Sequence, residues 1–329
     1  MAEQTFFCIK PYAFLKREQI KELIIGKEFT IQASKVVWLN EQDMEAIYGH
    51  EAPSAYFDSC SYFMRTGMVE IGVISGDNAI KNFVELCGED YKPLNCPKNS
   101  IRNIFGLADP VEFLGRKYYF NPIHRSRNRE DAQRETTYFW ENIYSRSPRN
   151  IVVDMVEYLY LSKGFNYVFD HHIKPAVELG RKLSEQCGAN EVVVELSLWL
   201  HDIGRLLEGN DDNHHIVSAR YAEAILPLLG IKNDVVGKIV HSIMAHRGIV
   251  AISTESIEDK VVASADGIIN IRQLPLLCYF AYKQKGLSFE EGMQAIDRKV
   301  RKSFTKVGAM FKQEVEKEFS YWQKIFTRC

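Results

Sequence analysis

The sequence lacks any apolar run of the roughly 18 residues that a membrane-spanning helix needs, so we expect no membrane partner. It also lacks an excess of one charge, because 41 Lys and Arg residues face 43 Asp and Glu residues, for a net charge of −2. This balance argues against a protein built mainly to coat nucleic acid or an anionic membrane. Residues 1–10 lack the charged-then-apolar order of a signal peptide, so we expect a cytoplasmic protein.

Paired cysteines are also missing. The seven cysteines are odd in number, scattered and without a CxxC spacing. This pattern favours free thiols in a reducing compartment over a disulfide framework or a zinc ribbon. In contrast, 46% hydrophobic and 12% aromatic residues are enough to build a sizeable core, which excludes wholesale disorder.

The pattern of hydrophobic residues changes near residue 145 of the 329-residue chain. Before that point, short β-branched stretches alternate with stretches of helical period. Strands are expected at 5–9, 30–38, 68–75 and 117–121, and helices at 17–25, 41–48 and 78–87. This order predicts an antiparallel α+β sandwich for a first domain, residues 1–145.

After residue 151 the strand signal fades and long amphipathic stretches follow. They lie at 153–162, 172–186, 192–200, 216–229, 235–246, 289–302 and 307–319. The last segment, 303–329, is expected to be one long helix that packs on this domain or binds a partner. We therefore expect a two-domain α+β protein with an all-α second domain, residues 146–329, and a polar linker at 144–150.

Metal-ligand side chains gather in the helical part. His201 and Asp202 stand at the end of an apolar stretch, 29 residues after His172. Imidazole nitrogens and carboxylate oxygens suit divalent transition metals. Because adjacent helical residues point about 100° apart, the doublet suits two ions, or one ion and a bridge, better than chelation of one ion. Taken alone, such a pair is more often a helix cap or a surface pair.

The surrounding residues distinguish these interpretations, because His214 or His215, His246 and Asp266 follow in order. The pattern H…HD…H…H…D over residues 165–275 resembles the HD-domain metal-dependent phosphohydrolase superfamily, which implies an all-α helical bundle. The metal ligands that this resemblance implies are His172, His201, Asp202 and Asp266 for a first ion, and His214 and His246 for a second.

Two of these positions have neighbours that compete for the same role. His215 competes with His214, because the double histidine leaves the register open by one residue. His171 is the alternate to His172, although the spacing to Gly180 favours His172. His241 lies off the helical face of His246 and is expected to be structural.

The implied cofactor is one or two divalent ions: Mn, Fe, Co, Ni or Mg, among which the ligand set does not choose. Such ions activate water and polarise phosphoryl oxygens, so His201 and Asp202 are the implied catalytic residues. Lys174 and Arg205 flank the site and either neutralise phosphate or form a solvated helix face.

Residues 4–140 carry a second set of motifs. Lys10-Pro11 follows the first expected strand, and residues 121–126 read Asn-Pro-Ile-His-Arg-Ser, with Glu135 eleven residues after His124. These motifs resemble nucleoside diphosphate kinase and imply its ferredoxin-like fold. His124 is then the implied nucleophile for a phosphoryl group, with its tautomer fixed by Glu135. The implied nucleotide-binding residues are Lys10, Tyr48, Arg102, Asn121 and Glu135.

This segment departs from the kinase pattern at several places. Tyr12 replaces the aspartate of Lys-Pro-Asp, Val84 stands where the family has an arginine, and the threonine expected after Gly88 is missing. Residues 124–127 read His-Arg-Ser-Arg instead of His-Gly-Ser-Asp. Loss of one cationic phosphate ligand costs about 1.5–3 kcal/mol, so several such losses weaken or abolish turnover. The added arginines, which bind a polyanion or form a solvated basic loop, are Arg125, Arg127 and Arg129.

Together the two resemblances predict a metal-dependent phosphohydrolase that cleaves a phosphate ester or anhydride of a nucleotide or related compound. Its first domain is expected to bind nucleotide or to assemble a homo-oligomer. One alternative is a bifunctional enzyme that also transfers phosphoryl groups through His124. Another is a nucleotide sensor or scaffold without catalysis.

Overall fold

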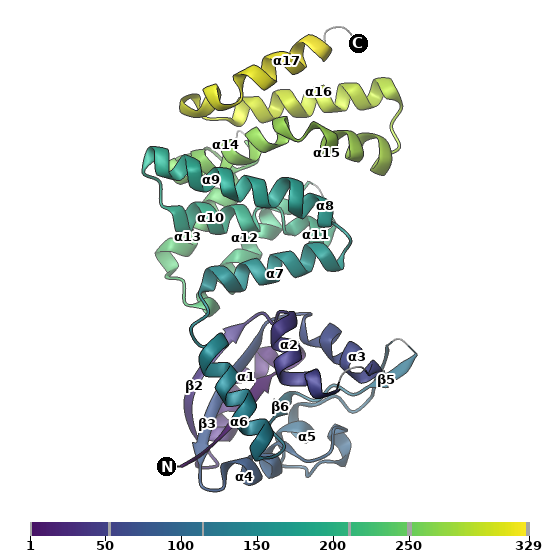
Figure 1. Ribbon diagram of the computed structural model, residues 1–329, viewed down its shortest axis with the longest axis vertical. Coiled ribbons are helices and arrows are strands. Elements are labelled where there is room, and N and C mark those ends of the chain that lie inside the picture. The colour runs from purple at the N-terminus through teal and green to yellow at the C-terminus, as the bar shows by residue number, and fades with distance from the viewer. Residues whose placement is uncertain (1, 52–53, 114, 210–211, 249–251, 327–329) are drawn as a thin grey trace. The chain divides into compact units, whose positions relative to one another are not determined.

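The computed structural model describes residues 2–51, 54–113, 115–209, 212–248 and 252–326. The chain divides into two compact units, Met1–Met155 and Val156–Cys329, shown in Figure 1. The division falls inside helix α7 (Pro148–Ser162), later than the boundary expected at residue 145. The expected linker is not loose, because Arg146 Nη2 lies 2.6 Å from Asp43 Oδ1 within the first unit. Cys329 lies outside the described residues.

The first unit is built on a four-stranded antiparallel sheet with the order β2-β3-β1-β6. Its strands are β1 (Glu3–Ile9), β2 (Thr30–Val37), β3 (Val69–Gly76) and β6 (Ile123–Arg125). The strand expected at 117–121 is not in this sheet: β5 (Arg116–Tyr118) pairs with β4 (Val111–Phe113) as a separate ribbon. Strand β6 was not expected, because three residues are too few to show an alternating pattern.

The helices of this unit begin at side-chain caps in several places. Asn40 and Asp43 form a reciprocal capping box at the start of α2, which satisfies backbone N–H groups that the first turn leaves unpaired. The α-helices are α1 (Arg17–Ile25), α2 (Glu41–Tyr48), α3 (Ala55–Met64), α4 (Ala79–Cys87), α5 (Ile101–Phe105) and α6 (Arg129–Tyr138). Shorter turns are η1 (Pro11–Lys16), η2 (Gly49–Glu51), η3 (Pro93–Asn95) and η4 (Phe139–Ile143).

The side chains of strand β1 alternate between the two faces of the sheet. Phe7 and Ile9 join a buried cluster with side chains of α1 and α4, such as Ile20 and Phe83. In the register of β1 with β6, Cys8 is opposite His124 and Phe7 is opposite Arg125. Since opposed residues share a face, Arg125 is on the side of α1 and α4 and His124 is on the other side.

The second unit is helical throughout its regular structure. Its longer helices are the end of α7, α9 (Lys174–Cys187), α10 (Glu191–Leu200), α12 (His214–Ile225), α13 (Asn233–Ala245), α14 (Ile257–Arg272), α16 (Phe289–Lys306) and α17 (Glu316–Phe326). The shorter ones are α8 (Asn166–Val168), η5 (Phe169–Ile173), α11 (Gly204–Glu208), η6 (Pro227–Leu229), α15 (Leu274–Cys278), η7 (Tyr279–Gln284) and η8 (Ala309–Glu314).

Helix α14 is the central helix of this unit. Its residues from Val261 to Ile271 are all buried, and it packs against α9, α10, α13 and α16. Helices α9 and α10 also approach closely, because a Cβ at Gly180 would lie 2.2 Å from Leu198 Cδ1. The small residue at position 180 therefore lets α9, which follows His172, meet α10, which precedes His201.

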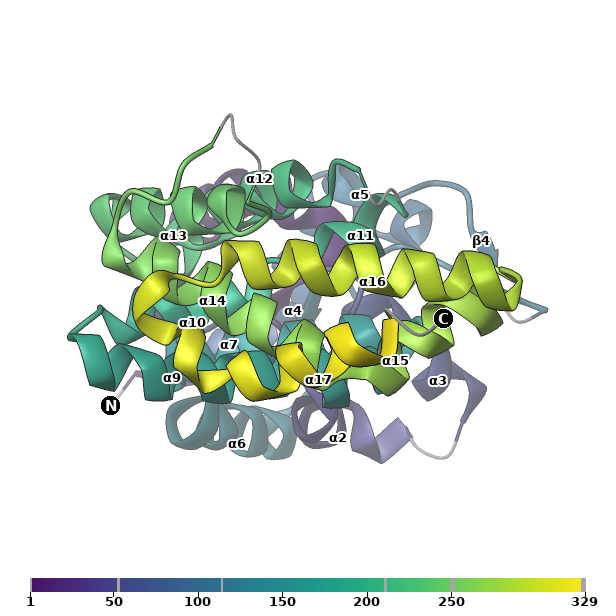
Figure 2. The ribbon, with the colours of Figure 1, turned by 90° about the horizontal axis from the view of Figure 1, so that it is seen from above.

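The expectation of one long helix over residues 303–329 is wrong. Helix α16 ends at Lys306, Val307 is extended, and α17 begins only at Glu316. The break has a tertiary cause, because Gly308 N donates to Ser264 Oγ of α14 at 2.9 Å. The two helices then lie side by side, as Figure 2 shows, and Trp322 Nε1 donates to Ile271 O of α14.

Within the described ranges, no single helix has the length and apolar content of a membrane span. Helix α14 and the segment Leu274–Gln284 pass that test only as a pair bent by 76°.

Candidate functional site

The His201-Asp202 doublet lies at the end of helix α10. Asn190 caps the start of this helix by accepting from Val193 N, and residues 193–200 are all buried. The apolar helix therefore places the residue that follows it, His201, in the interior, where its exposure is 0%. Asp202 follows in the turn before α11 and is 7% exposed.

Four side chains meet around this turn. His172 Nε2, from the segment before α9, is 3.4 Å from His201 Nε2 and 3.3 Å from Asp266 Oδ1. Asp202 Oδ2 lies 3.7 Å from His172 Nε2 and 3.6 Å from His201 Nε2. His172, the His201-Asp202 pair and Asp266 are far apart in sequence. The fold thus brings two imidazoles and two carboxylates into one group.

A second group shares Asp202 with the first. Its other carboxylate oxygen, Oδ1, is 3.2 Å from His214 Nε2 and 3.8 Å from His246 Nε2. The two imidazole nitrogens of His214 and His246 are 3.4 Å apart. Three overlapping sets of ligand atoms, each within 4.8 Å, result: His172–His201–Asp202, His201–His246–Asp266 and Asp202–His214–His246.

Backbone carbonyls orient two of these rings. His201 Nδ1 is 2.8 Å from Leu198 O, and His246 Nδ1 makes the corresponding contact with Ile243 O. We assign the ring proton to Nδ1 in both residues, since only an N–H can donate to a carbonyl. Each Nε2 then presents a lone pair to the group, the arrangement that metal-ligating histidines have in proteins.

Burial keeps the imidazoles of His172, His214 and His246 neutral. It lowers the pKa of His172 to about 4 and that of His214 to about 3, although the nearby carboxylates act in the opposite direction. Burial and the neighbouring His201 hold the pKa of His246 well below its usual range. Neutral imidazole is the form that binds a metal, so the group needs no deprotonation near pH 7.

The two carboxylates stay ionised for a different reason. Burial opposes ionisation of Asp202, but the positive charge of Arg205 holds the pKa of this carboxyl well below its usual range. The positive charge of Lys306 does the same for Asp266. Asp202 Oδ1 is buried and accepts no hydrogen bond from the described residues, although Arg205 Nε lies 3.1 Å away. The donor set, neutral imidazoles with ionised carboxylates, fits a divalent transition metal.

Two side chains that sequence reasoning missed hold Asp266 in place. Lys306 Nζ, at the end of α16, donates to Asp266 Oδ2, and Asn270 Nδ2 donates to Oδ1 at 2.7 Å. The spacing of four residues from Asp266 to Asn270 on one helix is a signal that could have found Asn270. Lys306 gives no such signal, because only the folding of α16 onto α14 brings it there.

The alternates to the expected ligands lie elsewhere. His171 is exposed, with its ring 4.3 Å from that of Tyr167, and His215 takes part in none of the ligand sets. His241 Nδ1 is 2.9 Å from Asp259 Oδ2, outside the group. Lys174 pairs with Asp170 at 2.9 Å and is half exposed, whereas Arg205 contacts Asp202 directly. The structure therefore brings His172, His214 and Arg205 to this place, and not His171, His215 or Lys174.

The first unit holds the second candidate site, around His124 on strand β6. His124 Nε2 is 3.0 Å from Glu135 Oε1 on α6, and Ser126 Oγ donates to the other oxygen of Glu135 at 2.7 Å. We assign the ring proton to Nε2, which leaves the lone pair on Nδ1. Burial lowers the pKa of His124 despite the opposing effect of Glu135, so the ring is neutral and nucleophilic near pH 7.

The other expected residues of this site are buried nearby. The Tyr48 ring centroid is 4.7 Å from that of His124, and Lys10 and Arg102 lower the pKa of His124 through their positive charge. Asn121 is 5% exposed, and its Oδ1 has no hydrogen-bond partner among the described residues. The structure thus gathers charged and polar groups from several elements around the ring.

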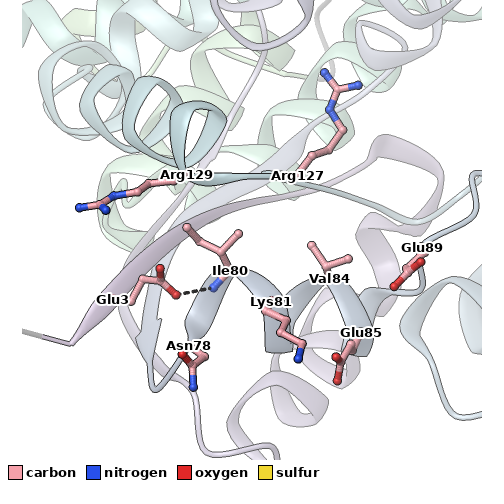
Figure 3. A pocket seen from close by; sticks show the side chains of 9 residues that line it. All are labelled: Glu3, Asn78, Ile80, Lys81, Val84, Glu85, Glu89, Arg127 and Arg129. Atoms are coloured by element: carbon pink, nitrogen blue, oxygen red, sulfur yellow. Dashed lines mark hydrogen bonds between the residues drawn. The ribbon is translucent and has the colours of Figure 1, made fainter.

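A groove of about 400 Å³ lies beside α4. Among the residues that line it are Val84, Glu89, Arg127 and Arg129. Figure 3 shows Val84 pointing from α4 toward the chain that carries the two arginines, while both guanidinium groups turn away from it. Arg127 pairs with Asp131 at 3.2 Å. Neither arginine therefore points toward Val84, the position at which the kinase resemblance implies an arginine.

Comparison with known proteins gives the first unit a family. The sequence model described as "Nucleoside diphosphate kinase" matches residues 3–143. The nucleoside diphosphate kinase of Hydrogenovibrio crunogenus is 32% identical over 146 residues, which are 44% of this chain and 96% of that protein. That of Methanocaldococcus jannaschii is 30% identical over 144 residues, 43% of this chain and 95% of the relative.

A solved structure is also similar. The crystal structure of the nucleoside diphosphate kinase of Aquifex aeolicus is 26% identical, with a TM-score of 0.38, and the match covers 44% of this chain and 98% of that one. The sequence matches to nearly complete relatives carry the assignment. On their strength, the chain belongs to the nucleoside diphosphate kinase family through its first unit.

Proposed function

We propose that this protein is a metal-dependent phosphohydrolase of the HD-domain type, acting on a phosphate ester or anhydride of a nucleotide. The observation that carries the proposal is the buried group around Asp202. Its four imidazoles and two carboxylates form three overlapping sets of ligand atoms. Burying so many ligand-type groups together is costly unless they bind something. A nucleotide substrate is favoured because the first unit belongs to a family named for nucleoside diphosphates.

The ligands divide into two positions in this proposal. His172, His201, Asp202 and Asp266 hold a first divalent ion, and Asp202 with His214 and His246 holds a second. When bound, such ions polarise phosphoryl oxygens and lower the pKa of water, which supplies a nucleophile at neutral pH. Asp202 would offer Oδ2 to the first position and Oδ1 to the second.

The chain's own cations complete the site. Arg205 Nε is 3.1 Å from Asp202 Oδ1 and orients that carboxylate, and its Nη2 lies 3.3 Å from His214 Nε2. Lys306 and Asn270 fix the rotation of Asp266, so that Oδ1 faces His172. The buried walls of α10 and α14 exclude bulk water from the inner side of the group.

Metal content and phosphate release test this proposal. The purified chain is expected to retain a divalent metal and, with added Mn, Co, Ni or Mg, to release phosphate or a nucleoside from a nucleotide panel. The paired variant His201→Ala/Asp202→Ala removes ligands of both positions and is expected to lower release at least 1000-fold. His171→Ala is the matched control, because it removes an exposed neighbouring histidine outside the ligand sets. A wild-type chain that binds no metal and hydrolyses nothing would contradict the proposal and favour a nucleotide sensor.

A second function is proposed for the first unit, phosphoryl transfer through His124. The contact of His124 with Glu135 supports it, because it leaves Nδ1 with a lone pair in a neutral ring. Incubation with a nucleoside triphosphate is expected to produce an acid-labile phosphohistidine that His124→Ala abolishes. Glu135→Gln is expected to lower its rate of formation about 10–100-fold, since the amide neither fixes the tautomer as well nor stabilises positive charge on the ring. Absence of the phosphohistidine in the wild-type chain would leave this unit a nucleotide-binding or assembly module.

A further inference from the structure

Lys299 is a cation of helix α16 that the structure leaves without a partner. Its side chain is partly buried and still accessible to solvent, and among the described residues it makes no hydrogen bond and no ion pair. Two residues further along the helix, Arg301 pairs with Asp297 at 2.9 Å. A partly buried ammonium group loses some of its hydration, so it is costly unless an anion replaces the lost water.

The pairing of α16 with α14 is antiparallel and close. Gly308 N, just after α16, donates to Ser264 Oγ of α14 at 2.9 Å. Five residues before Gly308, the carbonyl oxygen of Ser303 would lie 2.7 Å from a Cβ at Gly267. As the residue number rises on α14 it falls on α16, and these two contacts fix the level of each α16 residue along α14.

Lys299 lies one turn before Ser303, so the pairing puts it level with Asn270, one turn beyond Asp266 on α14. Lys306 lies seven residues after Lys299, which is close to two full turns, so the two lysines are on the same face of α16. Lys306 donates to Asp266 Oδ2. This face of α16 therefore has one lysine that is paired with a carboxylate of the ligand group and one that is not.

The electrostatics of the ligand group agree with this placement. Burial lowers the pKa of Lys299 to about 8, the charge of Lys306 acts in the same direction, and the charges of Asp266 and Asp202 oppose it. The charge of Lys299 in turn acts on His172 and Asp266. Lys299 is thus associated with the first of the two proposed ion positions.

The other two cations of the group are engaged by its carboxylates. Arg205 Nε lies 3.1 Å from Asp202 Oδ1, and Lys306 donates to Asp266. In the proposed function, the reacting phosphoryl group would be neutralised by the divalent ions. The charge of Lys299 is then left for a further anionic group of the substrate, and a phosphate beside the reacting one supplies it.

We propose that Lys299 binds a second phosphate of the substrate, next to the phosphoryl group that reacts. The site then favours nucleoside di- and triphosphates over monophosphates, because only the former have a phosphate to place against the ammonium group. Lys299 is a specificity-determining residue in this proposal, whereas Lys306 is a positioning residue for Asp266. The inference deepens the hydrolytic function proposed for the second unit and rests on it.

Titration calorimetry on the Mn-loaded full chain tests the inference without turnover. The probes are methylenediphosphonate, which has two phosphonate groups joined by a carbon that water does not cleave, and inorganic phosphate, which has one phosphorus centre. Mn is kept in excess of the probes, and the variant His201→Ala/Asp202→Ala measures any binding that belongs to the first unit. The second unit is expected to bind methylenediphosphonate at least tenfold more tightly than phosphate.

Lys299→Met is expected to weaken the binding of methylenediphosphonate at least tenfold and that of phosphate less than twofold, because it removes only the ammonium group. Lys299→Arg keeps the charge and is expected to keep the preference. Both variants are expected to retain Mn, since Lys299 is not one of the ligands. Arg298→Met is the matched control, because it removes an exposed cation from the adjacent position of α16, and its affinities are expected to equal those of the wild type.

Equal losses for the two probes in Lys299→Met, or no loss for either, overturn the inference. Thermal unfolding reports whether each variant folds, and Lys299→Gln supplies the comparison if Lys299→Met does not. A wild-type chain that retains Mn and releases phosphate from nucleotides, but binds the two probes equally, overturns this inference alone. A wild-type chain that retains no Mn overturns the proposed hydrolytic function and this inference with it.

Discussion

The charge state of single imidazoles links the ligand group to the stability of the second unit. In an unfolded chain a histidine titrates near pH 6.5, whereas His172 and His214 in the folded chain have pKa values of about 4 and about 3 because they are buried. Between these values the unfolded chain binds protons that the folded chain does not. Acid therefore favours the unfolded chain well before any aspartate is protonated.

We predict that the metal-stripped protein loses stability as the pH falls from about 6.5 toward 4. The midpoint of thermal unfolding, measured with a chelator present, is expected to decrease across this window and to be nearly constant from pH 7 to 8. His214→Asn removes one of the depressed groups and is expected to make the decrease shallower. A midpoint that does not change between pH 6.5 and 5 would show that these imidazoles are protonated in the folded chain.

At the scale of elements, a close approach of two helices positions His214. A Cβ at Gly204, the first residue of α11, would lie 2.2 Å from the carbonyl oxygen of His214, and Gly204 N donates to Ser218 Oγ of α12 at 2.9 Å. Without a side chain at position 204, the start of α12 reaches Asp202. The contact between α11 and α12 thus sets the distance from His214 to the shared carboxylate.

Gly204→Ala is predicted to destabilise the second unit by about 1–3 kcal/mol, because backbone atoms of His214 must move to admit the methyl group. The same variant is expected to weaken metal binding through His214. Gly237→Ala is the matched control: Gly237 is exposed within α13 and nothing lies within 4 Å of its added Cβ. That change is expected to stabilise the helix by about 0.5–1 kcal/mol. Chemical denaturation of both variants measures the two effects, and equal stabilities would contradict the role given to Gly204.

The elements that could be predicted from the sequence are those with a long periodic pattern. Helices α1 and α2 have the bounds expected for them. The break after Lys306, where α16 ends, was not expected, because it depends on the bond from Gly308 N to Ser264, a residue remote in sequence. Strand β6 was missed because three residues carry no measurable period. Local pattern does not encode such tertiary contacts.

The candidate sites show the same distinction. The motif residues His172, His201, Asp202 and Asp266 were expected together because their pattern resembles that of a known family, and the structure brings them together. Lys306 could not be found, because its contact with Asp266 depends on how α16 packs on α14.

For the whole molecule, the two units have separate hydrophobic cores, divided within α7. A ligand that binds one folded unit stabilises that unit by mass action, by about 2.7 kcal/mol at a free concentration of 100 times its Kd. Ligands of the two proposed sites are therefore expected to act on different parts of the melting curve.

We predict that adding Mn to the metal-stripped chain raises the temperature of one of two calorimetric transitions, and that ADP raises the other. The variant His201→Ala/Asp202→Ala is expected to lose the response to Mn and to keep the response to ADP. His171→Ala serves as the control that keeps both. A single transition that both ligands shift together would show that the units unfold as one cooperative body.

The cationic side chains beside the buried carboxylates affect how the chain folds before it binds a metal. Arg205 accompanies Asp202 and Lys306 accompanies Asp266, so each buried carboxylate already has a positive neighbour supplied by the protein. A zinc finger has no such substitute, and it stays unfolded until its ion arrives. Here maturation is expected to occur in two steps: the newly made chain first folds around its own lysine and arginine, and the ion later exchanges into a finished scaffold.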